Sequence, residues 1–257
     1  MPEGDVLRRT AAGLDRALAG SALVRADLRW PGASAVHLAG RTVLGTVAYG
    51  KHLLTRFDDE RTLHTHLRME GSWRIAPSTA PRAGGIDVRA VLVGPRWSAV
   101  GERLGMLDVL ATRDEHAVIG HLGPDVLADD FPRVGLTQAL HRFAATGPTP
   151  VAEVLLDQRV QAGIGTIWMA ESLFSRGIWP WTPADHMADP ASLLMTAREL
   201  MARSVAADQV QSGRVHGRLG RPCSRCGTPI ARGVARRPPM ERPVFWCPTC
   251  QGKGSTR

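Results

Sequence analysis

The chain places all four of its cysteines between residues 223 and 250, and their spacing constrains the fold more than any other feature. Cys223-x2-Cys226 and Cys247-x2-Cys250 are separated by twenty residues, which is the spacing of a four-thiolate zinc site. Four thiolates complete a tetrahedral shell and leave no position for a substrate, so we expect one structural Zn²⁺. A redox role for the CxxC pairs is the alternative, but it lacks a thioredoxin-like βαβ context.

The positive charge is concentrated in the same part of the chain. Residues 201–257 carry 11 Lys and Arg against 2 Asp and Glu, whereas the whole chain of 257 residues has a net charge of +8. Such a tail is typical of proteins that bind a polyanion such as nucleic acid, although a solubilising tail is the alternative. No apolar run reaches the length of a membrane span and no signal peptide is recognisable, so we expect a cytosolic protein.

The hydrophobic pattern changes from strands to helices along the chain. Apolar residues at helical spacing predict an amphipathic helix over residues 5–19. From 22 to 122, short β-rich runs separated by Gly, Pro and Asp predict an antiparallel sandwich or barrel, with 106–112 and 117–122 as the last runs. Helices are predicted beyond residue 135, and a loop-rich basic segment then leads into the cysteines. The predicted helices are 136–147, 150–159, 166–177 and 191–205.

Lysine is rare among the basic residues. Of the 32 Lys and Arg, only Lys51 and Lys253 are lysine. A chain that otherwise uses arginine has a use at position 51 for a compact ammonium that can give up its proton. Chance retention is the alternative interpretation.

Five separated stretches together resemble the Fpg/Nei family of DNA glycosylases (formamidopyrimidine-DNA glycosylase and endonuclease VIII), on its endonuclease VIII side. In chain order they are MPEG, YGKHLL, HLRMEGSW, LDQRVQAGIGTIWMAESLF and ERPVFWCPTCQ. The resemblance implies a multidomain α+β fold. Its expected parts are an N-terminal antiparallel β-sandwich with flanking helices (1–123), a helix–two-turn–helix domain (124–215) and a zinc-finger β-hairpin domain (216–257).

The resemblance also implies an activity, that of a bifunctional DNA glycosylase and abasic-site lyase of base excision repair. The implied nucleophile is Pro2, freed by removal of Met1, whose secondary amine attacks C1′ of the damaged nucleotide, displaces the base and forms an iminium that allows β,δ-elimination. An α-amino group has a pKa near 8, so a useful fraction is unprotonated at neutral pH. Glu3 is the implied general acid/base. Lys51 matches a lysine close to the lesion phosphate and the leaving base.

Further residues match the family's DNA contacts. Arg242 matches a zinc-finger arginine that grips phosphates around the flipped nucleotide. Met69, together with Arg68, occupies the place of the loop that fills the hole left by the flipped base, and Arg103 adds a second contact. For Met69 a core position on an alternating strand is the alternative. We expect His64 and His66, on that same strand, to be ordinary sheet residues.

Position 166 departs from the family pattern. In GIGTIW, Gly165 lets the backbone approach a phosphate at a helix N-terminus, but Thr166 stands where the family nearly always has asparagine. We expect DNA binding to survive but to weaken, because threonine donates a single hydrogen bond. An alternative function is therefore a catalytically weakened paralogue that recognises damaged or abasic DNA. A zinc-ribbon adaptor is a third possibility, which would leave the N-terminal motif and Lys51 without a role.

The expected partner is damaged duplex or abasic-site DNA, bound by a monomer in the bacterial cytosol, without a membrane. Oxidised pyrimidines are the bases expected of the endonuclease VIII branch. Oxidised purines, hydantoins and bulky alkylated bases would undergo the same chemistry, so they remain alternative substrates.

Overall fold

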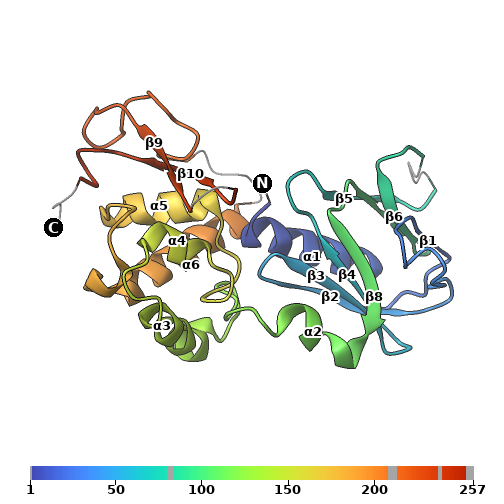
Figure 1. The fold of residues 1–257 in the computed structure, drawn as a ribbon. Coiled ribbons are helices and arrows are strands. Elements are labelled where there is room, and N and C mark those ends of the chain that lie inside the picture. Colours follow the sequence, from blue (N-terminus) through green and yellow to red (C-terminus); the bar gives the residue numbers. More distant parts are fainter. Residues whose placement is uncertain (1, 80–83, 208–212, 237–238, 253–257) are drawn as a thin grey trace. The chain divides into compact units, whose positions relative to one another are not determined.

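The structure is a computed structural model that describes residues 2–79, 84–207, 213–236 and 239–252 (Figure 1). The chain divides into two compact units, Met1–His121 and Leu122–Arg257. We describe each unit by itself.

The N-terminal unit begins with helix α1 (Gly4–Leu18). Its apolar residues Leu7, Ala11, Leu14 and Leu18 repeat at helical spacing and are all buried. A stripe of this kind is buried against another layer, here chiefly strand β2 (Val43–Tyr49). The helix predicted for residues 5–19 is therefore present.

Two antiparallel four-stranded sheets follow, and they form the β-sandwich that the sequence predicts. In spatial order the first sheet is β1 (Arg25–Leu28), β6 (Val88–Val93), β7 (Trp97–Glu102) and β5 (Ser72–Pro77). The second is β2, β3 (His52–Phe57), β4 (Arg61–His66) and β8 (Met106–Ala111). Both sheets contribute to one core with α1, which includes Leu53, Phe57, Leu63, Leu92 and Ala99.

One prediction for this unit is wrong, and one strand was not predicted. The run at 117–122 is no strand; the chain forms a short 3-10 helix, η1 (Thr112–Asp114), and then helix α2 (His116–Ile119). Glu115 accepts hydrogen bonds of 2.8 and 2.7 Å from the Arg56 guanidinium and 2.7 Å from the Thr62 hydroxyl, which holds the chain in a helical turn once β8 has ended. Strand β7 was missed because Ser98–Gly101 are all buried and show no alternation.

The C-terminal unit is helical and ends in a β-hairpin. Its elements are η2, a π-helix (Phe131–Gly135), α3 (Leu136–Ala144), α4 (Val151–Leu156), α5 (Thr166–Arg176), the 3-10 helix η3 (Ala184–His186), α6 (Pro190–Ala206), β9 (Ala231–Ala235) and β10 (Arg242–Trp246). The helix predicted over 150–159 is shorter than expected. Its last residue is Leu156, because Asp157 is extended (φ −80°, ψ 105°) and its carboxylate accepts the backbone N–H of Arg159 at 2.9 Å.

The helices and the hairpin of this unit share one hydrophobic core. Val154, Met169 and Leu193 from the helices lie in the same buried cluster as Val244 and Cys247 from the hairpin segment. The finer division into a helical domain (124–215) and a zinc-finger domain (216–257) stays a prediction.

Candidate active site and metal centre

Pro2 and Glu3 lie at the start of α1. Glu3 precedes the first helical residue, and its carbonyl oxygen accepts the backbone N–H of Leu7 at 3.1 Å. Glu3 is only 1% exposed. The N-terminal end of a helix carries partial positive charge and favours an anionic side chain. The fold thus keeps a carboxylate next in sequence to Pro2, where it can exchange protons with a group bound at the amine. Met1 lies outside the described residues.

Lys51 occupies the second position of the two-residue turn between β2 and β3. Tyr49 and His52 are the last paired residues of the hairpin, and Gly50 has a positive φ of 56°. A turn of this kind requires positive φ at its first central residue, which glycine adopts without strain. The sequence YGKH therefore sets the position of Lys51 in the turn at the end of the β2–β3 hairpin.

The residues expected to fill the vacated base position lie on turns between strands. Arg68 and Met69 are in the turn from β4 to β5, and Met69 is 66% exposed, so the alternative of a core position is wrong. Arg103 is in the turn from β7 to β8, and its guanidinium lies 3.5 Å from the carboxylate of Glu70. Both arginines have positive φ, 50° for Arg68 and 48° for Arg103. Such conformations are uncommon for residues other than glycine and cluster at functional sites.

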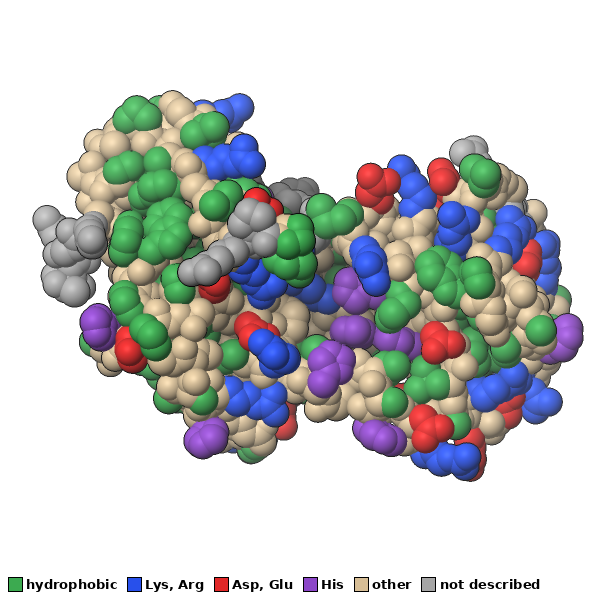
Figure 2. All heavy atoms as spheres, viewed as in Figure 1, with side chains coloured by type: hydrophobic (Ala, Val, Ile, Leu, Met, Phe, Trp, Pro, Cys, Tyr) green, Lys and Arg blue, Asp and Glu red, His purple; other side chains and the backbone are tan. Residues whose placement is uncertain are grey.

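Three histidines of the same unit form an array that the sequence did not indicate. The ring atoms His52 Nδ1 and His64 Nε2 share a hydrogen bond of 2.8 Å, and the two rings are stacked with centroids 5.0 Å apart. His66 lies edge-on to His52, also with centroids 5.0 Å apart. Figure 2 shows histidine side chains gathered on one face of this unit. His64 and His66 are strand residues, as expected. Their contacts with His52 join residues that are 12 and 14 positions apart in the sequence, and the alternation of residues along one strand does not predict such contacts.

Burial keeps these imidazoles neutral. It is the main cause that lowers the pKa of His52 to about 3 and that of His66 to about 4, and Lys51 adds to both shifts by repulsion. Burial likewise lowers the pKa of His64, although Asp108 and Glu115 oppose the shift.

Acid should therefore destabilise the folded protein before its carboxylates titrate. Between pH 6.5 and about pH 4 the unfolded chain binds protons at His52 and His66 that the folded protein does not, so the free energy of unfolding falls as the pH falls. We expect a loss of about 2 kcal/mol per pH unit between pH 6 and 5, and nearly constant stability above about pH 8. Urea unfolding at several pH values measures this. A His52→Phe variant with an equally steep dependence would contradict the assignment.

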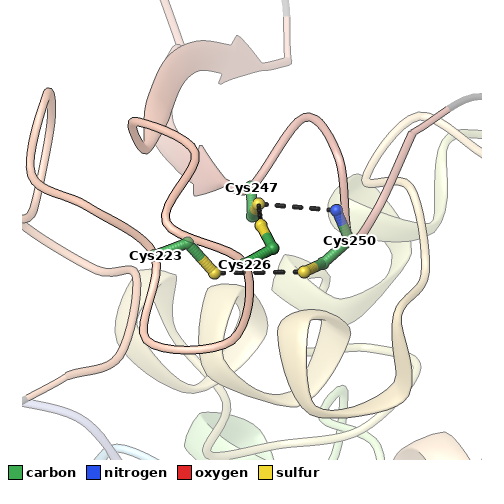
Figure 3. Close-up of side chains that lie close together, drawn as sticks. All are labelled: Cys223, Cys226, Cys247 and Cys250. Carbon is green, nitrogen blue, oxygen red and sulfur yellow. Dashed lines mark hydrogen bonds between the residues drawn. The ribbon is translucent and has the colours of Figure 1, made fainter.

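The four cysteines of the C-terminal unit converge on one point (Figure 3). The Sγ atoms of Cys223 and Cys250 are 3.9 Å apart, those of Cys226 and Cys247 are 3.4 Å apart, and all four lie within 4.8 Å of one another. Zinc–sulfur bonds of about 2.3 Å in a tetrahedron place the sulfurs about 3.8 Å apart, so this set fits the ion. Backbone N–H groups of Arg225 and Cys250 point at Cys223 Sγ and Cys247 Sγ, each at 3.4 Å, which favours thiolates. In the described part of the chain this is the one group of at least three His, Cys, Asp or Glu residues that suits a metal.

Two glutamines shape the turn that leads into α5. Gln158 donates to the Ile164 carbonyl at 2.9 Å and accepts the Gly163 N–H at 3.0 Å. The buried Gln161 donates to the carbonyls of Val154 and Leu155, both at 3.0 Å. These bonds replace the backbone pairing that an irregular segment loses. The backbone of the turn is therefore held in place from α4 to the start of α5.

Gly165 and Thr166 form the N-terminus of α5. Gly165 precedes the helix with an extended backbone, and Thr166 is its first residue and only 5% exposed. The backbone N–H of His216 donates to the carboxylate of Glu171 in α5 at 2.9 Å, and the ring of His216 lies edge-on to Phe245 of β10, with centroids 5.1 Å apart. His216 is thus a residue that sequence reasoning missed, and it links α5 to the hairpin.

Arg242 is the first residue of β10 and pairs with Ala235 of β9. Its guanidinium donates to the carbonyl of the neighbouring Glu241 at 2.9 Å. Another arginine of the tail has a structural role. Arg225 donates to the carbonyls of Phe174 and Ser175 at 2.8 and 3.0 Å, and so binds the first cysteine turn to the C-terminal end of α5.

Comparison with known proteins agrees with this architecture. Residues 1–123 match the family model described as the formamidopyrimidine-DNA glycosylase N-terminal domain. The chain is 41% identical to the probable endonuclease 8 2 of Streptomyces coelicolor, over 100% of this chain and 96% of that protein. It is 38% identical to the DNA-(apurinic or apyrimidinic site) lyase Nei2 of Mycolicibacterium smegmatis, over 98% of this chain and 99% of that one.

Among solved structures, the Lactococcus lactis formamidopyrimidine-DNA glycosylase, noncovalently bound to DNA that contains an abasic site, superimposes with a TM-score of 0.84. It is 22% identical and covers 98% of this chain and 100% of its own, so it shows the fold alone. A β-sandwich, a helical segment and a hairpin with four converging cysteines make up the fold of this class of DNA glycosylase, as the sequence predicts. The chain belongs to the formamidopyrimidine-DNA glycosylase and endonuclease VIII family, on the endonuclease VIII side.

Among the described residues, none of the helices combines the length and the apolar character that crossing a membrane requires.

Proposed function

We propose that the protein is a bifunctional DNA glycosylase and abasic-site lyase of base excision repair. The observation that carries the proposal is the full-length identity of 38 to 41% to an abasic-site lyase and a probable endonuclease 8. The N-terminal motif supports it, because Pro2 and the buried Glu3 lie together at the start of α1. Since the substrate is chromosomal DNA, we place the protein in the bacterial cytosol.

The chemistry assigned to these residues is covalent. The lone pair of the freed Pro2 nitrogen bonds to C1′ of the nucleotide while the bond from C1′ to the base breaks, and the base leaves with the bonding electrons. The sugar ring then opens, because the C1′–O4′ bond breaks as O4′ takes a proton, and an iminium remains at C1′. This iminium draws electrons, so that a proton leaves C2′ and the 3′ phosphate departs; a second proton then leaves C4′ and the 5′ phosphate departs. Glu3 carries protons to and from the sugar, and Lys51 contacts the phosphate and the leaving base. Water finally hydrolyses the imine and frees the amine.

DNA is the proposed partner, and both units contribute contacts. In the N-terminal unit we assign Arg68, Met69 and Arg103, because strained turns present them and Met69 is exposed. In the C-terminal unit we assign Arg242 at the start of β10 and the backbone of Gly165 and Thr166 at the start of α5. The N-terminus of an eleven-residue helix suits a phosphate.

The proposed ion is one Zn²⁺, held by Cys223, Cys226, Cys247 and Cys250. It takes no part in the chemical steps, since four thiolates fill its coordination shell. Bound there, it would link the two cysteine turns to each other and so fix the position of the β9–β10 hairpin.

Borohydride reduction in the presence of abasic-site DNA tests the activity. An imine between Pro2 and the sugar is reduced to a stable amine, so we expect a covalent complex that migrates with the summed mass of protein and DNA. The alternative, a weakened paralogue that only binds DNA, is favoured by the threonine at position 166. That protein would retain the DNA without ever forming the covalent complex.

Thr166→Asn should strengthen binding to abasic-site DNA. An amide side chain has two N–H donors in addition to its acceptor oxygen, whereas the threonine hydroxyl donates a single hydrogen bond. We expect an affinity about fivefold higher, the equivalent of one net hydrogen bond. Fluorescence anisotropy with labelled DNA measures it, and Thr137→Asn, at an exposed position near the start of α3, is the matched control. Equal affinities for the parent and Thr166→Asn would remove the assigned contact.

A further inference from the structure

The array formed by His52, His64 and His66 connects two turns that the proposed function uses. His52 directly follows Lys51 at the start of β3, and His66 ends β4 immediately before the turn that carries Arg68. His52 and His66 are also direct partners across the two strands. A displacement of one imidazole is therefore transmitted to both turns.

The hydrogen bonds of the array fix how these rings point. The backbone N–H of Arg68 donates to His66 Nδ1 at 2.8 Å. A neutral imidazole that accepts at Nδ1 carries its proton at Nε2, so the tautomer of His66 is set by the turn that follows it. The 2.8 Å hydrogen bond between His52 Nδ1 and Nε2 of the buried His64 couples the tautomers of these two rings, because one nitrogen carries the proton and the other accepts it.

Charged groups surround the array on both sides. Lys51, Arg68 and His121 repel a proton on His52 or His66, whereas Asp108 and Glu115 attract one to His64. Because the rings are neutral, they place no further positive charge next to the Lys51 ammonium.

Packing of the sheet does not by itself require histidines at these three positions. Leu53, Leu54 and Leu63 on the same two strands are buried and apolar. Within the described residues His64 Nδ1 is buried without a hydrogen-bond partner, which is unfavourable relative to an apolar side chain of similar size. Polar groups kept at such a cost are expected at functional sites.

We propose that His52 and His64 are positioning residues of the lyase reaction, which hold the Lys51 turn and the Arg68–Met69 turn in a fixed relation. The role rests on the proposed function. His64 anchors His52 through the shared hydrogen bond, His52 packs on His66, and His66 holds the backbone of Arg68.

Two substitutions at one position separate ring packing from hydrogen bonding. His52→Phe keeps an aromatic ring between His64 and His66 but removes the hydrogen bond. His52→Asn removes the ring but keeps a polar atom close to the place of Nδ1. His37→Phe, at an exposed histidine outside the array, is the matched control.

The measured quantities are the rate constant of borohydride trapping at saturating abasic-site DNA and the dissociation constant for that DNA. We expect His52→Phe to trap about tenfold more slowly, because a small misplacement of a group near the reaction centre is costly in rate. Its dissociation constant should stay within about twofold of the wild-type value, and His52→Asn should recover most of the rate. His37→Phe should match the wild type in both quantities.

The outcomes are distinguishable. If the wild-type protein traps DNA and His52→Phe traps it equally fast, the positioning role is wrong and the proposed function stands. If the wild-type protein forms no adduct, the proposed function fails and the role with it. Should His52→Phe not fold, ¹⁵N chemical shifts of His66 in the wild-type protein decide instead. A proton on Nδ1, or a charged ring at pH 7, overturns the inference.

Discussion

Acetylation of the Pro2 nitrogen should abolish covalent capture of abasic-site DNA, with a loss of about 10³-fold or more in the trapping rate. The amine lone pair forms the bond to C1′, and in an amide that lone pair is delocalised into the carbonyl and no longer nucleophilic. A form that retains Met1 should fail for the same reason. The measurement is borohydride trapping with each form, after mass spectrometry has established the state of its N-terminus.

Binding provides the control for this experiment. The dissociation constant for uncleaved DNA should change by no more than about threefold, because the blocked amine is lost as a nucleophile and most phosphate contacts remain. Pro2→Gly with a free amine is the matched variant, since a primary amine still forms an imine, and it should retain part of the trapping. Wild-type cutting by fully acetylated protein would show that Pro2 is not the nucleophile.

Replacement of Cys226 by serine should cost the protein its zinc and most of its DNA affinity. Structural zinc sites supply about 10 to 16 kcal/mol of apparent binding free energy, much of which is folding free energy. The loss would reach beyond the hairpin, because the buried Val244 and Cys247 lie in the same core as helices α5 and α6. We expect a lower melting temperature and an affinity for abasic-site DNA reduced about 100-fold, as phosphate contacts from the hairpin disappear.

Zinc content, thermal unfolding and anisotropy with labelled DNA measure these effects on the same preparation. Ser224→Ala is the matched control, because Ser224 is exposed within the same CxxC turn and is not one of the four thiols. It should retain one zinc per chain and wild-type affinity. If Cys226→Ser protein held a full equivalent of zinc and bound DNA normally, the four-cysteine site would not be the structural centre that we propose.

Some elements of the fold followed from local pattern alone. The stripe of Leu7, Ala11, Leu14 and Leu18 located α1. The CxxC pairs predicted four thiols at one point, and they converge there. The apolar stripe lies within a single helix. Each CxxC pair has a ligand type and a spacing that imply a second pair binding the same ion.

Other features were hidden because they depend on burial or on partners distant in sequence. Residues 117–122 have the composition of a strand, but Glu115 is bound by Arg56 and Thr62, and the chain turns into a helix instead. The sequence was also consistent with Met69 on a strand in the core. In the structure Met69 is 66% exposed and lies on a turn.

The sequence by itself determined the family, the change from a β-rich half to a helical half followed by two cysteine turns, and the residue types at the proposed reaction centre, because those depend on local periodicity and on short motifs. The tertiary structure alone decided which of these residues meet. Antiparallel register sets His52 beside His66 and within hydrogen-bond distance of His64, and a shared core joins the hairpin to the helices. Such contacts arise from the packing of whole layers, and no window of a few residues along the chain contains them.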